Sequence, residues 1–343
     1  MKAVVKPGPV KGAEWRDVDI PTIGPNDLLV KVQAAAICGT DNHIYEWTPW
    51  AQERVTPPMI FGHEYAGEVV EVGSAVAGWQ VGDLVAAETH IPCLQCYQCR
   101  TGRQHTCEQM RIIGVHVDGA FSEYAALPVA CAWKLPSGTS PELGAILEPI
   151  GVAANGLFKD RIDGASVAII GCGPIGIFGA QLAVAAGARQ LFATDINAYR
   201  RDMARRIVPE ATVLNPLEDD VEAIVAEATE GRGVDVAIEL SGSQPGTEQA
   251  FNILAKGGRV SLVGLPSRPI TLEMTGAIIY REAVVYGSTG RLMWDTWYQV
   301  DALLKAGAFD PTPVITHRFP MSAFDEALEL TRGGNAGKVI LTP

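Results

Sequence analysis

The chain is short of positive charge, with 27 lysines and arginines against 39 aspartates and glutamates, a formal net charge of −12. A negative surface repels phosphate backbones and anionic lipids, which argues against binding to nucleic acid or to a membrane surface. Nor does the chain have the composition of a disordered protein, because 48% of its residues are apolar and only 19% are charged. We therefore expect a folded protein that acts on a small molecule.

Long apolar runs are also scarce. Residues 164–188 carry no charge, yet several glycines and Pro174 interrupt them, as in a buried strand, turn and helix rather than a membrane span. The amino terminus has no apolar stretch of the kind found in export signals. The sequence therefore predicts a cytoplasmic location.

Strands without intervening helices dominate the first 140 residues, where glycine and proline separate short apolar runs. The expected strands are 2–6, 28–36, 64–72, 84–88, 121–127 and 132–135. This pattern predicts a β-rich domain, followed by a helix over 141–158.

Strands and helices alternate after residue 160, which predicts a doubly wound parallel sheet and an α/β fold class. The expected strands here are 167–170, 191–194, 212–214, 234–240, 259–263 and 283–287. The tail predicts helices over 294–305 and 322–331 and strands over 315–319 and 338–341. The simplest arrangement is a β-rich domain formed by residues 1–150 and 291–343, with a nucleotide-binding domain at 151–290 inserted between them.

A glycine motif, G-x-G-x-x-G, follows the first strand of that inserted domain and opens a helix. Gly171 and Gly173 would let a pyrophosphate approach the backbone, and Gly176 would let the helix pack closely on the strand. Asp195 ends the next strand, where a carboxylate accepts hydrogen bonds from an adenosine ribose and repels the 2′-phosphate of NADP. The motif therefore predicts NAD as the cofactor.

Four of the seven cysteines lie within fifteen residues: Cys93, Cys96, Cys99 and Cys107. Four thiolates at such spacing can enclose one tetrahedral zinc ion, and a closed shell leaves no position for substrate. We expect a structural zinc in a lobe over 90–108, with an iron–sulfur cluster or disulfides as the alternatives. Cys38, His63, Glu64 and Glu148 offer a second set of metal ligands, but their spacing alone does not join them.

The sequence resembles the zinc-dependent medium-chain dehydrogenases over essentially the whole chain. The resemblance rests on Cys38-Gly-Thr40-Asp-x-His43, Gly62-His63-Glu64, Val81-Gly82-Asp83, the four-cysteine segment and the glycine turn, which follow one another along the chain. It implies a GroES-like catalytic domain and a Rossmann domain, NAD, and two zinc ions per subunit. It also implies a homotetramer.

The resemblance assigns roles to individual residues as well. The catalytic zinc would be held by Cys38 and His63, with Glu64 or Glu148 as the acidic ligand, while Thr40 and His43 would carry the proton of the substrate hydroxyl away. The catalytic residues would thus be Thr40, His43 and Glu148. The residues implied to bind NAD are Gly171, Gly173, Pro174, Ile175, Gly176, Asp195, Arg200, Val263, Gly264, Leu265, Ser288 and Thr289.

Residues 40–52 and 289–298 resemble the members of this family that oxidise the secondary alcohol of L-threonine to 2-amino-3-oxobutanoate. Polyol and 2,3-butanediol dehydrogenases share the metal residues and remain the alternative. A non-catalytic NAD-binding protein of the same fold is disfavoured, because every residue of the metal set and the proton path is present.

Overall fold

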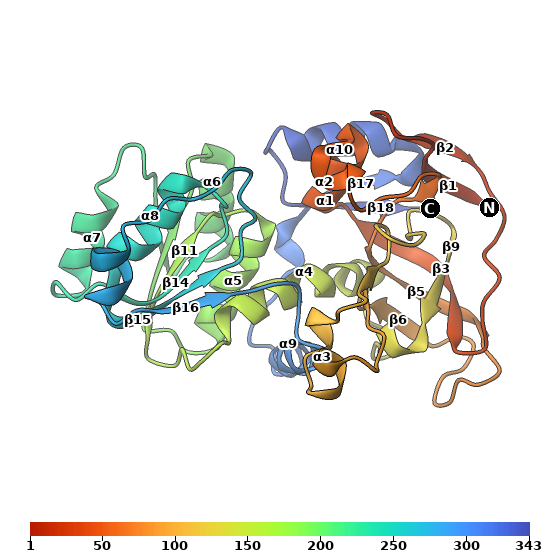
Figure 1. The fold of residues 1–343 in the computed structure, drawn as a ribbon, viewed down its shortest axis with the longest axis horizontal. Coiled ribbons are helices and arrows are strands. Elements are labelled where there is room, and N and C mark those ends of the chain that lie inside the picture. The colour runs from red at the N-terminus through yellow and green to blue at the C-terminus, as the bar shows by residue number, and fades with distance from the viewer. The chain divides into compact units, whose positions relative to one another are not determined.

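The computed structural model describes all 343 residues, and its contacts divide the chain into two compact units (Figure 1). Unit 1 comprises Met1–Pro149 and Ile315–Pro343, and unit 2 comprises Ile150–Val314. Residues 291–314, which the sequence assigned to the first domain, thus belong to unit 2. There the Gln181 side chain donates a hydrogen bond of 2.6 Å to the carbonyl oxygen of Asp310.

Unit 1 is built on a seven-stranded sheet in the order β10-β6-β5-β3-β18-β17, with β9 paired to β3. A three-stranded sheet, β2-β1-β4, and the pair β7-β8 complete its strands. The bounds in the large sheet are β3 Asp27–Ala36, β5 Glu64–Val72, β6 Leu84–Ala87, β9 Tyr124–Pro128, β10 Ala132–Lys134, β17 Ile315–Pro320 and β18 Lys338–Thr342. The others are β1 Lys2–Lys6, β2 Glu14–Asp17, β4 Met59–Ile60, β7 His90–Ile91 and β8 Arg111–Ile112.

The register of the central strands brings three distant parts of the chain together. Ala36, at the end of β3, pairs with Glu64 at the start of β5 and with Ile340 in β18. The chain immediately after β3, the chain immediately before β5 and the first residues of β18 therefore meet at one end of the sheet.

Short helices lie around this sheet. They are α1 Gly39–Glu46, α2 Pro49–Gln52, α3 Tyr97–Arg100 and α10 Phe324–Arg332, with single turns η1 Gln104–Thr106, η2 Val129–Cys131 and η5 Met321–Ala323. The long helix α4 Pro141–Leu157 contains the boundary between the units.

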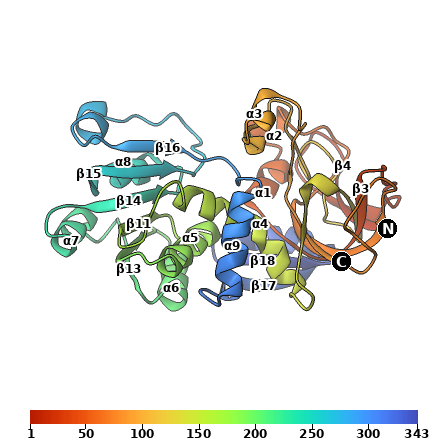
Figure 2. The same ribbon diagram turned by 90° about the horizontal axis from the view of Figure 1, so that it is seen from below.

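Unit 2 contains a six-stranded parallel sheet in the order β13-β12-β11-β14-β15-β16, whose strands lie side by side in Figure 2. The strands are β11 Ser166–Ile170, β12 Gln190–Thr194, β13 Ala211–Leu214, β14 Val234–Glu239, β15 Leu254–Leu262 and β16 Val284–Gly287. The helices are α5 Pro174–Ala185, α6 Ala198–Ile207, α7 Val221–Ala228, α8 Gln244–Asn252 and α9 Asp295–Lys305, with the π-helical turn η3 Thr275–Ile279 and the turn η4 Thr312–Val314.

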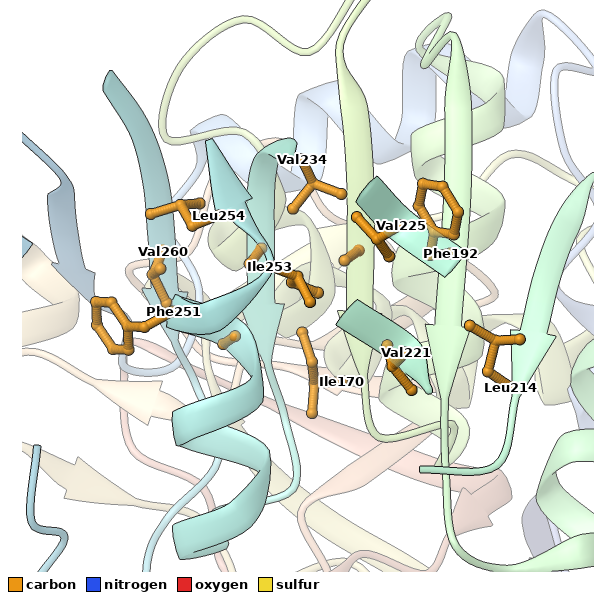
Figure 3. Close-up of a cluster of buried hydrophobic side chains, with 13 residues drawn as sticks. Ile170, Phe192, Leu214, Val221, Val225, Val234, Phe251, Ile253, Leu254 and Val260 are labelled. Carbon is orange, nitrogen blue, oxygen red and sulfur yellow. The ribbon is translucent and has the colours of Figure 1, made fainter. Parts of the chain in front are cut away.

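Alternation along β11 explains why helices cover both faces of this sheet. Ala168 and Ile170 join a buried cluster with Val221 and Val225 of α7 and with residues of α8 (Figure 3). Ile169 points to the opposite face, where Gly176 and Gly179 of α5 lie against it. Because both faces of the sheet are buried, the sequences of its strands are nearly continuous apolar runs.

The expected α/β fold with a doubly wound parallel sheet is confirmed. Strands β1 and β5 have the expected ends, and α4 stops one residue before its expected end. Helix α1 and the short strands β2, β4, β7 and β8 were not expected from the sequence. No helix combines the length and apolar character needed to span a membrane.

We predict that Gly67→Ala destabilises the protein, because a Cβ at Gly67 would lie 2.1 Å from the carbonyl oxygen of Lys31 on β3. Separating the two strands should cost roughly 1–3 kcal/mol and lower the melting temperature by several degrees. Gly8→Ala is the control, since its Cβ would meet nothing within 4 Å. Equal melting temperatures of the two variants in thermal denaturation would contradict the close approach of β5 to β3 at Gly67.

Candidate functional site

Cys38 lies in the short connection between β3 and α1, and the helix start holds it in place. Its backbone is extended, and its N–H donates a hydrogen bond of 2.8 Å to the carboxylate of Asp41 in the first turn of α1. Asp41 is fully buried, and burial raises the pKa of its carboxyl group. Its second oxygen, Oδ1, has no hydrogen-bond partner and lies 3.8 Å from Nδ1 of His63.

His63 and Glu64 stand where the chain enters β5, and both side chains are buried. The ammonium group of Lys338 on β18 contacts both carboxylate oxygens of Glu64 and the carbonyl oxygen of Ile37. Burial acts to lower the pKa of Lys338, but Glu64, Cys38 and Glu148 together raise that pKa above its ordinary value. The pair is thus a buried ion pair at the end of the sheet.

The ligand atoms of Cys38, His63 and Glu64 lie within 4.8 Å of one another. A thiol, an imidazole and a carboxylate form a donor set that suits zinc, and three protein ligands leave a coordination position open. His63 Nδ1 faces the buried Asp41 Oδ1 at 3.8 Å, an arrangement in which a carboxylate orients the imidazole of a metal-binding histidine. The residues present therefore fit a zinc ion.

Glu148, on α4, lies outside this three-residue cluster. It is buried, and its Oε1 accepts a hydrogen bond of 3.4 Å from the Thr89 hydroxyl. Burial raises the pKa of the Cys38 thiol, and the charges of Asp41 and Glu148 act in the same direction. Glu148 is thus close enough to Cys38 to influence it electrostatically.

Thr40 and His43 lie on α1, just beyond Cys38. The Thr40 hydroxyl oxygen is 3.7 Å from the Cys38 sulfur. His43 follows three residues later, so it lies one turn further along the same side of the helix, and it is exposed. The structure thus brings a hydroxyl and an imidazole to the helix whose start holds Cys38.

The four-cysteine segment forms a separate cluster. Its sulfur atoms all lie within 4.8 Å of one another, and none of the seven cysteines forms a disulfide. Backbone N–H groups of Cys93 and Gln109 donate to the Cys107 sulfur. Hydrogen bonds from the backbone of Cys99 and Glu108 lower the pKa of Cys96 to about 6. Sulfurs that accept backbone hydrogen bonds are well suited to bind a metal as thiolates.

The glycine turn of unit 2 has the geometry that its sequence predicts. Gly171 adopts a left-handed φ of +104°, and a Cβ at Gly176 would lie 1.9 Å from the Gly171 carbonyl oxygen. A Cβ at Gly173, the residue preceding α5, would meet nothing within 4 Å. The helix start therefore exposes backbone N–H groups beside open space, where Pro174 and Ile175 form its first turn.

Asp195 follows β12 and holds two backbone segments. One carboxylate oxygen accepts from the N–H of Cys172 and the other from the N–H of Asn197, both at 2.8 Å. Arg200 on α6 approaches the same carboxylate at 3.8 Å, and its buried Nε has no hydrogen-bond partner. Each carboxylate oxygen has a second lone pair, so Asp195 can still accept a hydrogen bond from a ligand.

The remaining expected cofactor residues follow β15 and β16. The N–H groups of Val263 and Gly264 both donate to the Glu239 carbonyl oxygen at 2.9 Å, and Leu265 is 85% exposed. Ser288 donates its N–H to Leu262, and its buried hydroxyl has no partner. Since β14, β15 and β16 are parallel neighbours, these segments meet at the carboxyl edge of the sheet.

Several residues of these sites were missed by sequence reasoning. Asn155 donates to the carbonyl oxygens of Thr289 and Gly290, and its own side-chain oxygen accepts from Lys159 at 2.6 Å. The carboxylate of Glu239 accepts the N–H groups of Ser241 and Gly242. The available signal was a charged residue at the end of a mostly apolar strand, as at Lys338 in β18 and Glu239 in β14.

Both units of the chain are similar to known protein families. The model of the alcohol dehydrogenase GroES-like domain matches residues 24–137, and that of the zinc-binding dehydrogenases matches residues 174–306. L-threonine 3-dehydrogenase of Pyrococcus abyssi is 45% identical over 341 residues, which cover 99% of this chain and 98% of the relative.

Solved structures share the fold over the full length. A candidate zinc-binding dehydrogenase from Sinorhizobium meliloti 1021, bound to NADP, is 34% identical with a TM-score of 0.91 and covers 100% of this chain and 99% of its own. The 2R,3R-butanediol dehydrogenase of Bacillus subtilis is 29% identical with a TM-score of 0.89 and the same coverage. Both halves of the sequence and their order along the chain thus agree with one family, and the chain belongs to the zinc-dependent medium-chain alcohol dehydrogenases.

Proposed function

We propose that this protein oxidises the secondary alcohol of L-threonine to 2-amino-3-oxobutanoate, with NAD as the hydride acceptor and zinc at the catalytic site. The observation that carries the proposal is the cluster of Cys38, His63 and Glu64 within 4.8 Å, next to the Thr40 hydroxyl. The choice of L-threonine rests on the relative named for that activity, which is 45% identical from end to end.

Cys38 and His63 would hold the catalytic zinc, with Glu64 or Glu148 as the acidic ligand. Zinc supplies a Lewis acid that lowers the pKa of an alcohol. Asp41 faces His63 Nδ1 at 3.8 Å and would orient the imidazole. Lys338 competes for the Glu64 carboxylate, which leaves Glu148 available as the alternative ligand.

The proton would leave through α1. Thr40 would accept it from the substrate hydroxyl, and His43 would pass it to solvent, to which its side chain is exposed. Histidine suits this step because its pKa lies near neutral pH. Glu148, the third proposed catalytic residue, would adjust the charge beside Cys38.

The four-cysteine cluster would hold a second, structural zinc, which gives two zinc ions per subunit. Four sulfur ligands complete a tetrahedral shell and leave no position for substrate. The metal would replace an apolar core in a segment that consists mostly of turns.

NAD would bind at the carboxyl edge of the parallel sheet in unit 2 and would supply the hydride acceptor. The turn Gly171–Gly176 would contact the pyrophosphate, and Asp195 and Arg200 would bind the adenosine ribose. The segments Val263–Leu265 and Ser288–Thr289 would contact the nicotinamide half. The unpartnered Arg200 Nε and Ser288 hydroxyl support these contacts.

We further propose a catalytic domain of residues 1–150 with the carboxyl-terminal segment, a Rossmann domain between them, a cytoplasmic location and a homotetramer. The edge strand β16 supports self-association, because Val284 and Val285 are exposed on it, and Ile279 and Tyr280 are exposed nearby in the chain.

Initial rates with NAD and a panel of L-threonine, sorbitol and 2,3-butanediol test the substrate directly. We expect kcat/KM for L-threonine to exceed that for either diol or polyol by at least tenfold. A preference for sorbitol or butanediol would favour the alternative enzyme class. Turnover of none of the three, with NAD still bound, would favour a non-catalytic NAD-binding protein.

Asp195→Asn tests the cofactor assignment. The substitution keeps one carbonyl oxygen but removes the charge opposing a 2′-phosphate, an interaction of up to about 4 kcal/mol at 4 Å. The ratio of kcat/KM for NADP to that for NAD should rise at least tenfold. Asp202→Asn, which removes an exposed charge on α6, should leave the ratio unchanged. A wild-type enzyme that already prefers NADP would contradict the role of Asp195.

A further inference from the structure

Thr48 occupies the tight turn between α1 and α2. Trp47 ends α1 in a left-handed conformation, with φ of 56°, and folds the chain back over the last turn of the helix. The N–H of Thr48 then donates to the carbonyl oxygen of His43 at 3.1 Å. The turn thus fixes the Thr48 backbone directly against His43.

The Thr48 hydroxyl does not make the hydrogen bond that is usual at its position. Thr48 is the residue that precedes α2, where a threonine hydroxyl ordinarily accepts a hydrogen bond from the helix backbone, but it makes no such cap. Its hydroxyl is instead 3.3 Å from Nδ1 of His43 and donates toward the carbonyl oxygen of His43 at 3.5 Å. Both of these contacts of the Thr48 hydroxyl are therefore with His43.

A hydroxyl has only one proton to donate. With that proton directed to the carbonyl oxygen, a lone pair of the Thr48 oxygen faces Nδ1, and the contact is made when Nδ1 carries the imidazole proton. A neutral imidazole protonated at Nδ1 has its acceptor lone pair on Nε2. The indole of Trp50, with ring centroids 5.8 Å apart, limits rotation of the ring, and Arg54 stacks on the indole.

We propose that Thr48 is a positioning residue that holds His43 in the tautomer with the proton on Nδ1, so that Nε2 is presented as the proton acceptor. This inference rests on the proposed role of His43 in carrying the proton. Thr48 acts through the orientation and tautomer of the imidazole, and it needs no contact of its own with substrate or cofactor.

The nitrogen shifts of His43 test this assignment. Solid-state ¹⁵N spectra of the sedimented, zinc-loaded full-length enzyme, labelled at its six histidines, separate protonated from unprotonated ring nitrogens, and His43→Ala assigns the signal. Wild type should show a protonated Nδ1 and an unprotonated Nε2 at pH 8. Thr48→Val, which keeps the shape but removes the hydroxyl, should convert His43 to a mixture of tautomers.

Kinetics provide the second measurement. Thr48→Val should lower kcat for L-threonine about 2- to 10-fold, the range of one neutral hydrogen bond, with KM unchanged. Thr48→Ser should restore both the spectrum and kcat. Thr139→Val, which removes a hydroxyl that donates to a local carbonyl elsewhere in unit 1, is the matched control and should change neither.

An unchanged His43 spectrum in Thr48→Val would overturn the proposal, as would a failure of Thr48→Ser to restore it. The spectrum is independent of turnover, so the two proposals can fail separately. An enzyme inactive on L-threonine whose His43 still responds to Thr48→Val would refute the proposed function alone. An active enzyme whose His43 does not respond would refute the role of Thr48 alone.

Discussion

The site of unit 1 depends on one register, the double pairing of Ala36 with Glu64 and with Ile340. Side chains alternate along a strand, so a slip of one residue would turn Glu64 away from Lys338 and separate it from Cys38. Gly67 keeps β5 close to β3 next to this point. A cluster of potential metal ligands drawn from two distant segments, with Lys338 from a third, therefore depends on ordinary sheet pairing.

This register gathers several acidic groups, which would favour a bound cation. Burial raises the pKa of Cys38 and Asp41, since the ionised form of each group lacks its full hydration in the interior. Lys338 is a single ammonium among them and is already bound to Glu64. A divalent cation would favour the thiolate and the carboxylates together, so metal binding and deprotonation would be coupled.

Much of this could be predicted from the sequence, because the decisive signals are local. The glycine turn, the four cysteines and the apolar strands of the parallel sheet each lie within a short segment, and spacing alone predicts them. The joining of Cys38 with His63 and Glu64 is different, because it results from strand pairing that no spacing reveals. Helix α1 was also missed, since its eight residues have few apolar positions and its stability comes from the Cys38–Asp41 contact and from packing. Lys338 was missed because a lysine in a strand ordinarily points to solvent, and only its buried partner explains it.

Anomalous diffraction from crystals of the enzyme, measured on both sides of the zinc absorption edge, would locate any bound zinc. We expect two zinc peaks per chain, one among Cys38, His63 and either Glu64 or Glu148, and one at the centre of the four cysteine sulfurs. A zinc-loaded, active enzyme with no peak beside Cys38 and His63 would show that these residues do not hold the catalytic metal.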